Sequence, residues 1–494
     1  MTKHEEALRK AELSLLELSK KVSEAKHRQM WHFSPKAGWM NDPNGLIFFK
    51  GKYHIFYQFN PYGAKWSAMH WGHAISDDLV NWEHLPIALA PSESYDNHPQ
   101  GGCFSGSAVD DNGVLTLIYT ATTNYGDGFV QSQCIATSKD GIHFEKYEGN
   151  PVIPGPPACG SKDFRDPKVW KHHDQWYMVV GSSKDNRGKA LLYQSDDLRK
   201  WQFVNVLCES RGELGTMWEC PDFFEIDGKS VLMFSPMGLG DRKTVYLVGD
   251  MDYKTGKVHY QSAGEVDWGF DFYAPQSMID DKGRRIIFAW ANAWDWMPWW
   301  KDFGPTETEG WCGSLSFPRQ IKLMKDGKLQ FIPVDEIEKL RVSEKESVNL
   351  NVSDARRVSL PASGKTAYEM KLELDLENSG AKQAVIELKA DEEKSIKLCC
   401  DLASAEISID RSNSDGWSTG INRCPLESAG KSKLVILVYV DRSYVEVYTD
   451  HYRTVLSSNV FSDEKATQAF ICAKGGNLRG KVTCYELGAM KVTG

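Results

Sequence analysis

The sequence predicts an all-β protein: a five-bladed β-propeller followed by a C-terminal β-sandwich, with a short N-terminal amphipathic helix. Short aromatic and β-branched runs separated by Gly, Asn and Asp turns fill about 290 residues after Trp31. Within them SDDLVNWEHL at Ser76 returns as SKDGIHFEKY at Ser138 and SDDLRKWQFV at Ser195. After Val342 the composition changes, and runs that alternate polar with apolar residues begin.

Residues 1–30 are expected to form the helix. Apolar residues recur there at steps of three and four, with Glu, Lys and Arg filling most other positions, which is the pattern of an amphipathic helix. This stripe either packs on the protein's own body or forms a subunit contact, so a monomer and a homodimer both remain open. The stripe consists of Leu8, Ala11, Leu15, Leu18, Val22 and Ala25.

Residues 31–335 are expected to form the propeller. The repeat is about 60 residues long and each unit holds about four strands, which favours propeller blades over a single sandwich. One four-stranded blade cannot bury both faces without neighbours. Counting units from Asp42 to about Gln330 gives roughly five blades.

Residues 345–494 are expected to form the β-sandwich. Trp almost disappears after Trp311, and runs such as AYEMKLELDLE from Ala367 and SYVEVYTD from Ser443 alternate with a period of two. That period is typical of antiparallel strands with one buried face. The boundary is placed in Phe331 to Ser347.

Composition excludes several classes of partner. The net charge is −9 and no long Lys/Arg run occurs, which argues against nucleic acid. The longest apolar runs have the length of strands, so no membrane partner is expected. Eleven cysteines, an odd number, and an N-terminus without a secretory signal pattern favour reduced thiols in the cytoplasm.

Three acids stand at nearly equivalent places in the repeat. Asp42-Pro43 lies in GWMNDPNG, Asp166-Pro167 follows Arg165, and Glu219 precedes Cys220-Pro221. Each precedes a strand-like run by a similar distance. If the first strand of each blade lines the central channel, all three carboxyls point into one axial pocket.

Paired carboxyls in different environments are what glycoside hydrolysis requires. Turn residues and an Asn around Asp42 favour its ionised form, whereas the apolar neighbours of Glu219 raise its pKa by desolvation. Arg165 would lower the pKa of Asp166 and orient it if their side chains meet. The sequence therefore predicts a nucleophile at Asp42 and an acid at Glu219.

These motifs resemble glycoside hydrolase family 32, the invertases, sucrose-6-phosphate hydrolases and fructan hydrolases. The resemblance is carried by WMNDPNG, FSGS at Phe104 to Ser107, FRDP at Phe164 to Pro167 and WECP at Trp218 to Pro221. GFDFYAPQ from Gly269 and GWCGSLSFPR from Gly310 extend it. It covers Trp31 to about Arg319 by motif and the C-terminal domain by position only.

The resemblance implies a retaining β-fructofuranosidase that cleaves sucrose, sucrose 6-phosphate or short β-fructans. It makes Asp42 the nucleophile, Glu219 the acid/base and Asp166 the transition-state stabiliser, with no metal or organic cofactor. The residues it places around the fructosyl ring are Asn41, Gln58, Trp66, Phe104, Ser105, Arg165, Cys220, Tyr273 and Trp290.

Two other functions stay open: a fructosyltransferase on the same site, and a non-catalytic propeller that binds carbohydrate. The presence of all three acids argues against the second. His70, His73 and His84 are interpreted as blade structure rather than metal ligands. Some tryptophans between Trp290 and Trp300 are expected at the pocket mouth. Candidate phosphate-binding residues are Lys36, Lys65, Lys184 and Arg187.

Overall fold

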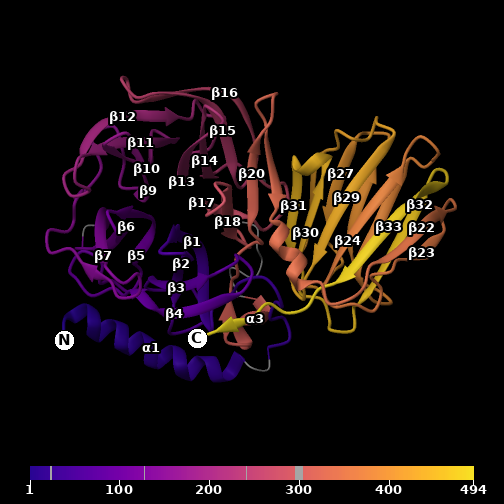
Figure 1. The fold of residues 1–494 in the computed structure, drawn as a ribbon, viewed down its shortest axis with the longest axis horizontal. Coiled ribbons are helices and arrows are strands. Elements are labelled where there is room, and N and C mark those ends of the chain that lie inside the picture. Colours follow the sequence, from indigo (N-terminus) through magenta and orange to yellow (C-terminus); the bar gives the residue numbers. More distant parts are fainter. Residues whose placement is uncertain (23–24, 127, 241, 295–303) are drawn as a thin grey trace.

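The fold is known from a computed structural model that describes residues 1–22, 25–126, 128–240, 242–294 and 304–494. The protein is mostly β and has two parts, which lie side by side in Figure 1. The first part, in indigo through magenta to salmon, is built from five sheets. The second, in orange to yellow, is a β-sandwich.

The five sheets follow one another along the chain. Each contains four consecutive antiparallel strands, except that β19 interrupts the order of the fifth and joins the first instead. The strands are, sheet by sheet, β1 (Gly38–Phe49), β2 (Lys52–Asn60), β3 (His70–Ser76) and β4 (Trp82–Leu89), with β19 (Trp311–Cys312) and β34 (Val492–Thr493) at the edges; β5 (Gly102–Asp111), β6 (Val114–Asn124), β7 (Phe129–Ser138) and β8 (Glu145–Lys146); β9 (Phe164–His172), β10 (Gln175–Lys184), β11 (Arg187–Ser195) and β12 (Gln202–Glu209); β13 (Met217–Ile226), β14 (Lys229–Met237), β15 (Val245–Asp252) and β16 (Lys257–Glu265); β17 (Tyr273–Ile279), β18 (Arg285–Trp290), β20 (Arg319–Leu323) and β21 (Leu329–Pro333).

The first strands of the five sheets form a closed ring. β1 contacts β5, β5 contacts β9, β9 contacts β13, β13 contacts β17, and β17 returns to β1. This arrangement, called the five-sheet ring below, brings residues more than 200 positions apart in the chain to one axis. The inner strands are largely buried even though they carry polar residues, among them Asn41, Asp42 and Asp166.

Tight turns set the register of these sheets. Asn112-Gly113 joins β5 to β6 and Asp227-Gly228 joins β13 to β14, and all four residues have positive φ. Two-residue hairpins require that conformation, and Asn, Asp and Gly adopt it most readily.

The sandwich packs two six-stranded antiparallel sheets around an aliphatic core that includes Leu372, Ile386 and Val438. The alternating runs of the sequence supply its inner faces. In spatial order the sheets are β22 (Glu346–Val352), β33 (Leu478–Glu486), β24 (Tyr368–Asp375), β29 (Lys433–Val440), β30 (Tyr444–Thr449) and β31 (Thr454–Asn459); and β23 (Arg357–Ser359), β32 (Gln468–Lys474), β25 (Gln383–Ala390), β26 (Ile396–Asp401), β27 (Glu406–Asp410) and β28 (Ile421–Pro425).

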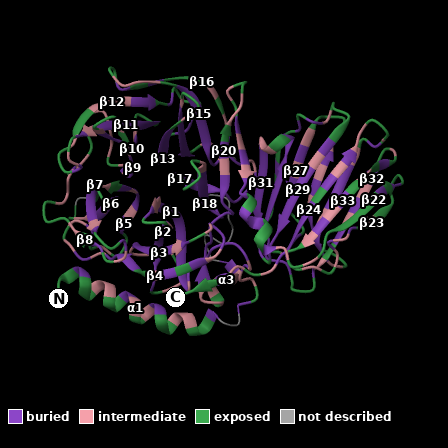
Figure 2. Ribbon diagram, in the orientation of Figure 1, coloured by how far each residue is buried: buried purple, intermediate pink, exposed green. Residues whose placement is uncertain are grey.

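The helix α1 (Lys3–Val22) lies along β4 at the edge of the five-sheet ring (Figures 1 and 2). Ala11, Leu15 and Val22 are buried, and Glu12 Oε1 accepts a hydrogen bond from the backbone of Ile87. The apolar stripe thus packs on the protein's own body. The remaining described helices are short: α3 (Gly304–Thr308), η1 (Asp335–Leu340) and η2 (Asp450–Tyr452).

Buried ion pairs join the two parts next to β17. Arg319 of β20 bonds to Asp267 at 2.9 Å within the first part and lies 3.4 Å from Glu446 of the sandwich, and Arg411 from the sandwich bonds to Asp271 at 2.6 Å. Asp267 and Asp271 lie in the segment that leads into β17, and β17 begins at Tyr273. The sandwich therefore fixes the start of one inner strand of the ring. No helix within the described ranges is long and apolar enough to span a bilayer.

Candidate active site

β-bulges on the inner strands position the three acids. Asn41 and Asp42 together oppose a single residue of β2, and the same two-to-one pairing occurs at Asp166-Pro167 against β10 and at Cys220-Pro221 against β14. Proline suits such positions because it has no N–H to donate to the ladder. Asp166 has a φ of 67°, which bends its strand locally.

Glu219 is not in the same register as the other two acids. Asp42, Asp166 and Cys220 each directly precede a proline, so by this pattern the residue equivalent to the two aspartates in the fourth sheet is Cys220; Pro167 and Pro221 lie within their bulges, whereas Pro43 pairs with Tyr57 just after its bulge. Glu219 stands one position earlier, as Asn41 and Arg165 do in their strands. The expected near-equivalence of the three acids is therefore off by one residue at Glu219.

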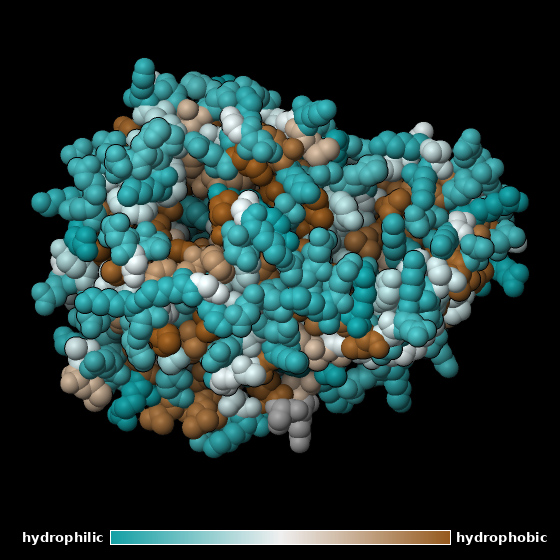
Figure 3. Space-filling view, viewed as in Figure 1, coloured by the Kyte–Doolittle hydropathy of each residue, from teal (hydrophilic) through white to brown (hydrophobic). Residues whose placement is uncertain are grey.

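The three carboxyls line one cavity of about 420 Å³. Figure 3 shows the molecule hollowed at the centre of the five-sheet ring. The cavity is lined by Asn41, Asp42, Gln58, Trp66, Gln100, Phe104, Ser105, Thr122, Phe129, Gln131, Lys162, Asp163, Arg165, Asp166, Glu219 and Trp294.

Asp42 is almost completely buried and is held by one oxygen. Its Oδ2 accepts hydrogen bonds from the Ser105 hydroxyl at 2.7 Å and the Cys220 thiol at 3.5 Å, whereas Oδ1 has no partner among the described residues. Burial raises the pKa of Asp42 to about 6, partly offset by the Ser105 hydrogen bond. The expectation that its surroundings favour ionisation is wrong, because desolvation outweighs the polar turn.

Asp166 is buried beside the other two acids. Its Oδ2 accepts a hydrogen bond from the backbone N–H of Cys220 at 2.9 Å, and its own N–H donates to Thr120 Oγ1 at 2.9 Å. Burial raises the pKa of Asp166 to about 7; the Arg165 charge opposes this, and Glu219 and Asp42 add to it. Cys220 thus touches both aspartates, one through its thiol and one through its backbone.

Glu219 is surrounded by donors rather than by apolar side chains. Arg165 Nη2 donates to its Oε1 at 2.9 Å, and the Tyr273 hydroxyl donates to its Oε2 at 2.5 Å. Burial raises the pKa of Tyr273 well above its usual value, so this hydroxyl keeps its proton. The expected apolar environment of Glu219 is incorrect, and Arg165 makes its ion pair with Glu219 instead of Asp166.

Six of the nine predicted binding residues line the cavity: Asn41, Gln58, Trp66, Phe104, Ser105 and Arg165. The other three lie behind it. Cys220 and Tyr273 contact the acids as described, while Trp290 is fully buried against Trp39 and Trp294. Trp294 takes the place expected of Trp290 at the cavity wall. Trp296, Trp299 and Trp300 lie outside the described residues.

Sequence reasoning missed several cavity residues, among them Thr122, Gln131 and Lys162. Thr122 ends the second strand and Gln131 lies in the third strand of their sheet, outside any of the acid-bearing motifs. Lys162 and Asp163 immediately precede FRDP, so a wider window around that motif could have found them. None of the suggested phosphate ligands Lys36, Lys65, Lys184 and Arg187 lines the cavity.

Comparison with protein families identifies this architecture. The family model for the glycosyl hydrolases family 32 N-terminal domain matches residues 32–333, and that for the family 32 C-terminal domain matches 336–486. The chain belongs to glycoside hydrolase family 32. The resemblance drawn from the acid-bearing motifs is thereby confirmed, and family 32 membership extends over the sandwich as well.

Relatives within family 32 match along nearly their whole length. A sucrose-6-phosphate hydrolase of Zymomonas mobilis is 40% identical, over 94% of this chain and 93% of that protein. A raffinose invertase of Escherichia coli is 37% identical, over 95% and 97%. A β-fructofuranosidase structure from Bombyx mori has a TM-score of 0.84 at 33% identity, covering 99% of this chain and 100% of the other. A variant of the Bombyx mori enzyme has been solved with sucrose.

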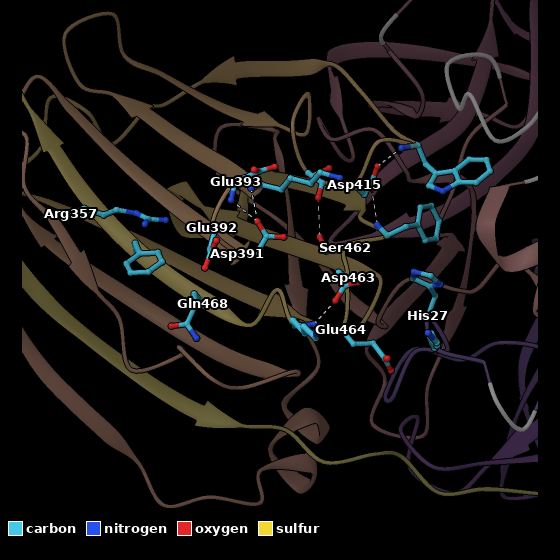
Figure 4. Close-up of a pocket in the computed structure, with 17 residues that line it drawn as sticks. His27, Arg357, Asp391, Glu392, Glu393, Asp415, Ser462, Asp463, Glu464 and Gln468 are labelled. Carbon is cyan, nitrogen blue, oxygen red and sulfur yellow. Dashed lines mark hydrogen bonds between the residues drawn. The ribbon is translucent and has the colours of Figure 1, made fainter.

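A second hollow, of about 1030 Å³, lies on the sandwich and reaches His27 (Figure 4). It is rich in acids, but their oxygens accept hydrogen bonds from turns: Asp391 from the N–H of Lys394, and Asp415 from those of Trp417 and Phe461. These carboxylates stabilise loops of the sandwich. The hollow contains none of the residues of the candidate active site.

The three histidines weighed as metal ligands are packed in the first sheet. His70 Nδ1 lies 3.0 Å from the carbonyl of Ala68, His73 Nε2 lies 3.0 Å from His54 Nδ1, and the His84 ring packs on Phe33. Burial lowers the pKa of each. Within the described ranges no group of three His, Cys, Asp or Glu residues could hold a metal ion.

Proposed function

We propose that the protein is a retaining β-fructofuranosidase that releases fructose from sucrose, sucrose 6-phosphate or short β-fructans. The observation that carries this proposal is the convergence of Asp42, Asp166 and Glu219 on one cavity, each with a different set of hydrogen-bond donors. Two carboxyls in different environments can divide the roles of nucleophile and acid/base. The names of the sucrose-6-phosphate hydrolase and invertase relatives support the substrate class.

Asp42 is the nucleophile. Ser105 and Cys220 fix its Oδ2, and Oδ1, which accepts no hydrogen bond from the described residues, keeps its lone pairs for the anomeric carbon of the fructosyl unit. Burial raises the pKa of the Cys220 thiol, so it remains a hydrogen-bond donor while Asp42 reacts. The product of the first step is a covalent fructosyl-enzyme.

Glu219 is the acid/base. In the first step it protonates the departing oxygen, and in the second it accepts a proton from the water that attacks the fructosyl-enzyme. The carboxylate formed between these steps is stabilised by Arg165 and Tyr273, whose donors contact both of its oxygens. Asp166, once ionised, stabilises the positive charge that develops on the fructosyl ring.

This chemistry needs proton transfer and a nucleophile, both supplied by side chains, so we propose no cofactor. We also propose that the five-sheet ring is a five-bladed propeller spanning residues 31–335, with the sandwich in 345–494 and the helix in 1–30. The closed ring of inner strands supports the blade count.

Eleven free thiols favour the cytoplasm as the compartment of the protein. Whether the protein is a monomer or a homodimer is a matter for mass measurement.

Product analysis by NMR tests the function. Purified protein is incubated with sucrose, sucrose 6-phosphate and a short inulin, and the first anomer of fructose is recorded. We expect β-fructose, and we expect the carboxyls of Asp42 and Glu219 to lie about 5–5.5 Å apart, as retention requires. Early α-fructose would overturn the mechanism, and oligosaccharide products in place of free fructose would favour the transferase.

Two substitutions test the assigned roles. Asp42→Asn and Glu219→Gln should each lower kcat by about three orders of magnitude or more, because each removes a group that reacts covalently or transfers a proton. Circular dichroism should show an unchanged fold. Asp174→Asn, an exposed aspartate far along the third sheet, is the matched control and should keep full activity. Near-normal turnover in either variant would mean that the substituted acid does not have the catalytic role proposed for it.

A further inference from the structure

The backbone N–H of Asp166 is held by a side chain from the neighbouring sheet. Asp166 lies in the bulge of β9, where the regular pairing with β10 is interrupted. There its N–H donates to Thr120 Oγ1 on β6 at 2.9 Å. A buried N–H needs an acceptor, and the fully buried Thr120 supplies it. The bulge therefore depends on a hydroxyl that belongs to another sheet.

Gln133 fixes the direction of this hydrogen bond. It lies directly opposite Thr120 in the pairing of β6 with β7, and its Oε1 accepts a hydrogen bond from the Thr120 hydroxyl at 2.9 Å. Its Nε2 donates to the carbonyl of Phe164 at 2.9 Å, so a reversed amide would place two oxygens against each other. A hydroxyl has one proton to donate. Because Gln133 receives that proton, the Thr120 oxygen is left to accept from Asp166.

These hydrogen bonds hold Asp166 in a backbone conformation that is unfavourable by itself. Its φ of 67° lies in the left-handed region, where residues other than glycine meet steric hindrance. Such a conformation persists only where the surrounding structure imposes it. Thr120 and Gln133 are both fully buried and bond to the backbone on either side of Arg165, so they constrain the chain at two points.

The same bulge directs the carboxyl of Asp166. A bulge re-aims the side chain that it carries. Here Oδ2 is aimed at the backbone N–H of Cys220 on β13, 2.9 Å away. Asp166 is therefore bonded to the second sheet through its backbone and to the fourth sheet through its side chain. If the bond to Thr120 is lost, the backbone can relax and the carboxyl can leave its place in the cavity.

We propose that Thr120 and Gln133 are positioning residues for the reaction, which hold the Asp166 carboxylate against the fructosyl ring without touching the substrate. This inference rests on the proposed function, in which Asp166 stabilises the positive charge of the transition state. Neither Thr120 nor Gln133 lines the cavity. The loss of an interaction that is made only in the transition state lowers kcat and leaves KM nearly unchanged.

Thr120→Val tests this role because it removes the hydroxyl and nearly keeps the shape of the side chain. Turnover is measured at pH 8 on the sugar that the wild type cleaves fastest among sucrose, sucrose 6-phosphate and a short inulin. We expect kcat to fall about tenfold or more while KM changes less than about twofold. Thr120→Ser keeps the hydroxyl and should retain most of the activity.

The pH profile separates positioning from a loss of folded protein. A displaced Asp166 carboxyl loses the hydrogen bond from Cys220 that lowers its pKa, so the acid limb of kcat/KM in Thr120→Val should move to higher pH by about half a unit or more. Partial unfolding would lower the whole profile without moving this limb. The control is Thr116→Val, a buried threonine of the same strand whose hydroxyl bonds to the carbonyl of Val114. It should leave kcat and the limb unchanged.

The outcomes separate the two proposals. If the wild type releases fructose but Thr120→Val keeps its kcat and acid limb, or if Thr116→Val is impaired in the same way, the positioning role is overturned and the proposed function stands. If Thr120→Val does not fold, Gln133→Met, which is close in shape to glutamine and removes the partner of the hydroxyl, must show the lower kcat and the shifted limb; wild-type values there overturn the role. If the wild type releases no fructose from any of the three sugars, both proposals fail.

Discussion

The pKa of Asp42, the proposed nucleophile, is set by the balance between burial and two hydrogen bonds. Burial raises its pKa to about 6, and the hydroxyl of Ser105 opposes that rise. A nucleophile must be ionised, so a carboxyl with this pKa is half protonated near pH 6 and increasingly inactive below it. The site therefore has an acid limit set by a raised pKa.

We expect kcat/KM to fall as the pH decreases from about 7 to below about 6, because both Asp166 and Asp42 must be ionised. Ser105→Ala removes a donor to the ionised form, which should raise the pKa of Asp42 and shift this limb to higher pH by about half to one unit. Ser107→Ala, two positions further along β5, does not contact Asp42 and should leave the limb in place. If the acid limb of the pH profile stays in place in Ser105→Ala, the limb does not report the ionisation of Asp42.

Asp166 is predicted to destabilise the folded state, because its carboxyl is buried in the candidate active site. Burial raises its pKa from 3.8 to about 7, so the folded state disfavours the ionised carboxylate and loses stability as the pH rises from about 4 to about 7. The loss builds up from about pH 4, where the unfolded chain begins to ionise, is complete above about pH 7, and disappears only below about pH 4. Asp166→Asn should therefore abolish most activity and raise the Tm by about 1–3 °C at pH 8, but less at pH 5.

Calorimetry at the two pH values measures this effect. Asp222→Asn is the contrasting variant, because Asp222 is a buried acid that pairs with Lys168 at 3.1 Å and its loss leaves that lysine without its ion-pair partner. It should lower the Tm at both pH values. A lower Tm for Asp166→Asn than for the wild type at pH 8 would contradict the proposed destabilisation by the ionised Asp166.

At the scale of elements, the bulges decide which residues reach the cavity. In a regular strand neighbouring side chains point to opposite faces, so consecutive residues cannot serve one site. A bulge breaks this rule, and in β1 and β9 it brings both Asn41 and Asp42, and both Arg165 and Asp166, to the cavity. The same device places Glu219 on the cavity and Cys220 between the two aspartates.

The helix α1 offers a matched pair of substitutions. Leu15 is 8% exposed and Leu16 is 60% exposed on the same helix. Leu15→Ala should lower the free energy of unfolding by about 2 kcal/mol, because it opens a cavity against the first sheet, and Leu16→Ala should change it by less than about 0.5 kcal/mol. Urea denaturation measures both. A larger effect of Leu16→Ala, with a change in molecular mass, would indicate that α1 forms a subunit contact.

At the scale of the whole molecule, a buried arginine holds the two parts together. Arg319 is fully buried and contacts Asp267 of the first part and Glu446 of the sandwich. Its guanidinium also lies 4.3 Å from the centre of the Phe272 ring, one residue before Tyr273. The domain interface and the donor to Glu219 are thus built on one segment.

Arg319→Met should lower the free energy of unfolding by about 3–5 kcal/mol, because it leaves two buried carboxylates without their partner. The control is Arg423→Met, which breaks an exposed pair with Glu406 and should change it by less than about 1 kcal/mol. Thermal and urea denaturation report both. Equal effects of the two variants would mean that the interface does not depend on this ion pair.

The sequence by itself determined that the fold is mostly β and which family the chain belongs to, and it singled out three acids that line one cavity. Periods of two and of about 60 residues are local properties of the chain, and motifs such as WMNDPNG and WECP are contiguous, so both can be read without coordinates. The contacts around the acids depend on closure of the five-sheet ring, which brings together residues far apart in the chain. Ser105 and Asp42 are 63 positions apart, Arg165 and Glu219 are 54 apart, and Cys220 and Asp42 are 178 apart.

Only the tertiary structure assigned the donors to the acids. It paired Arg165 with Glu219 instead of Asp166, and it buried Trp290 behind Trp294. The physical reason is that pKa values and ion pairs depend on burial and on distances of a few ångströms. Those distances are set by bulge register and by the packing of five sheets around one axis, which no single stretch of sequence encodes.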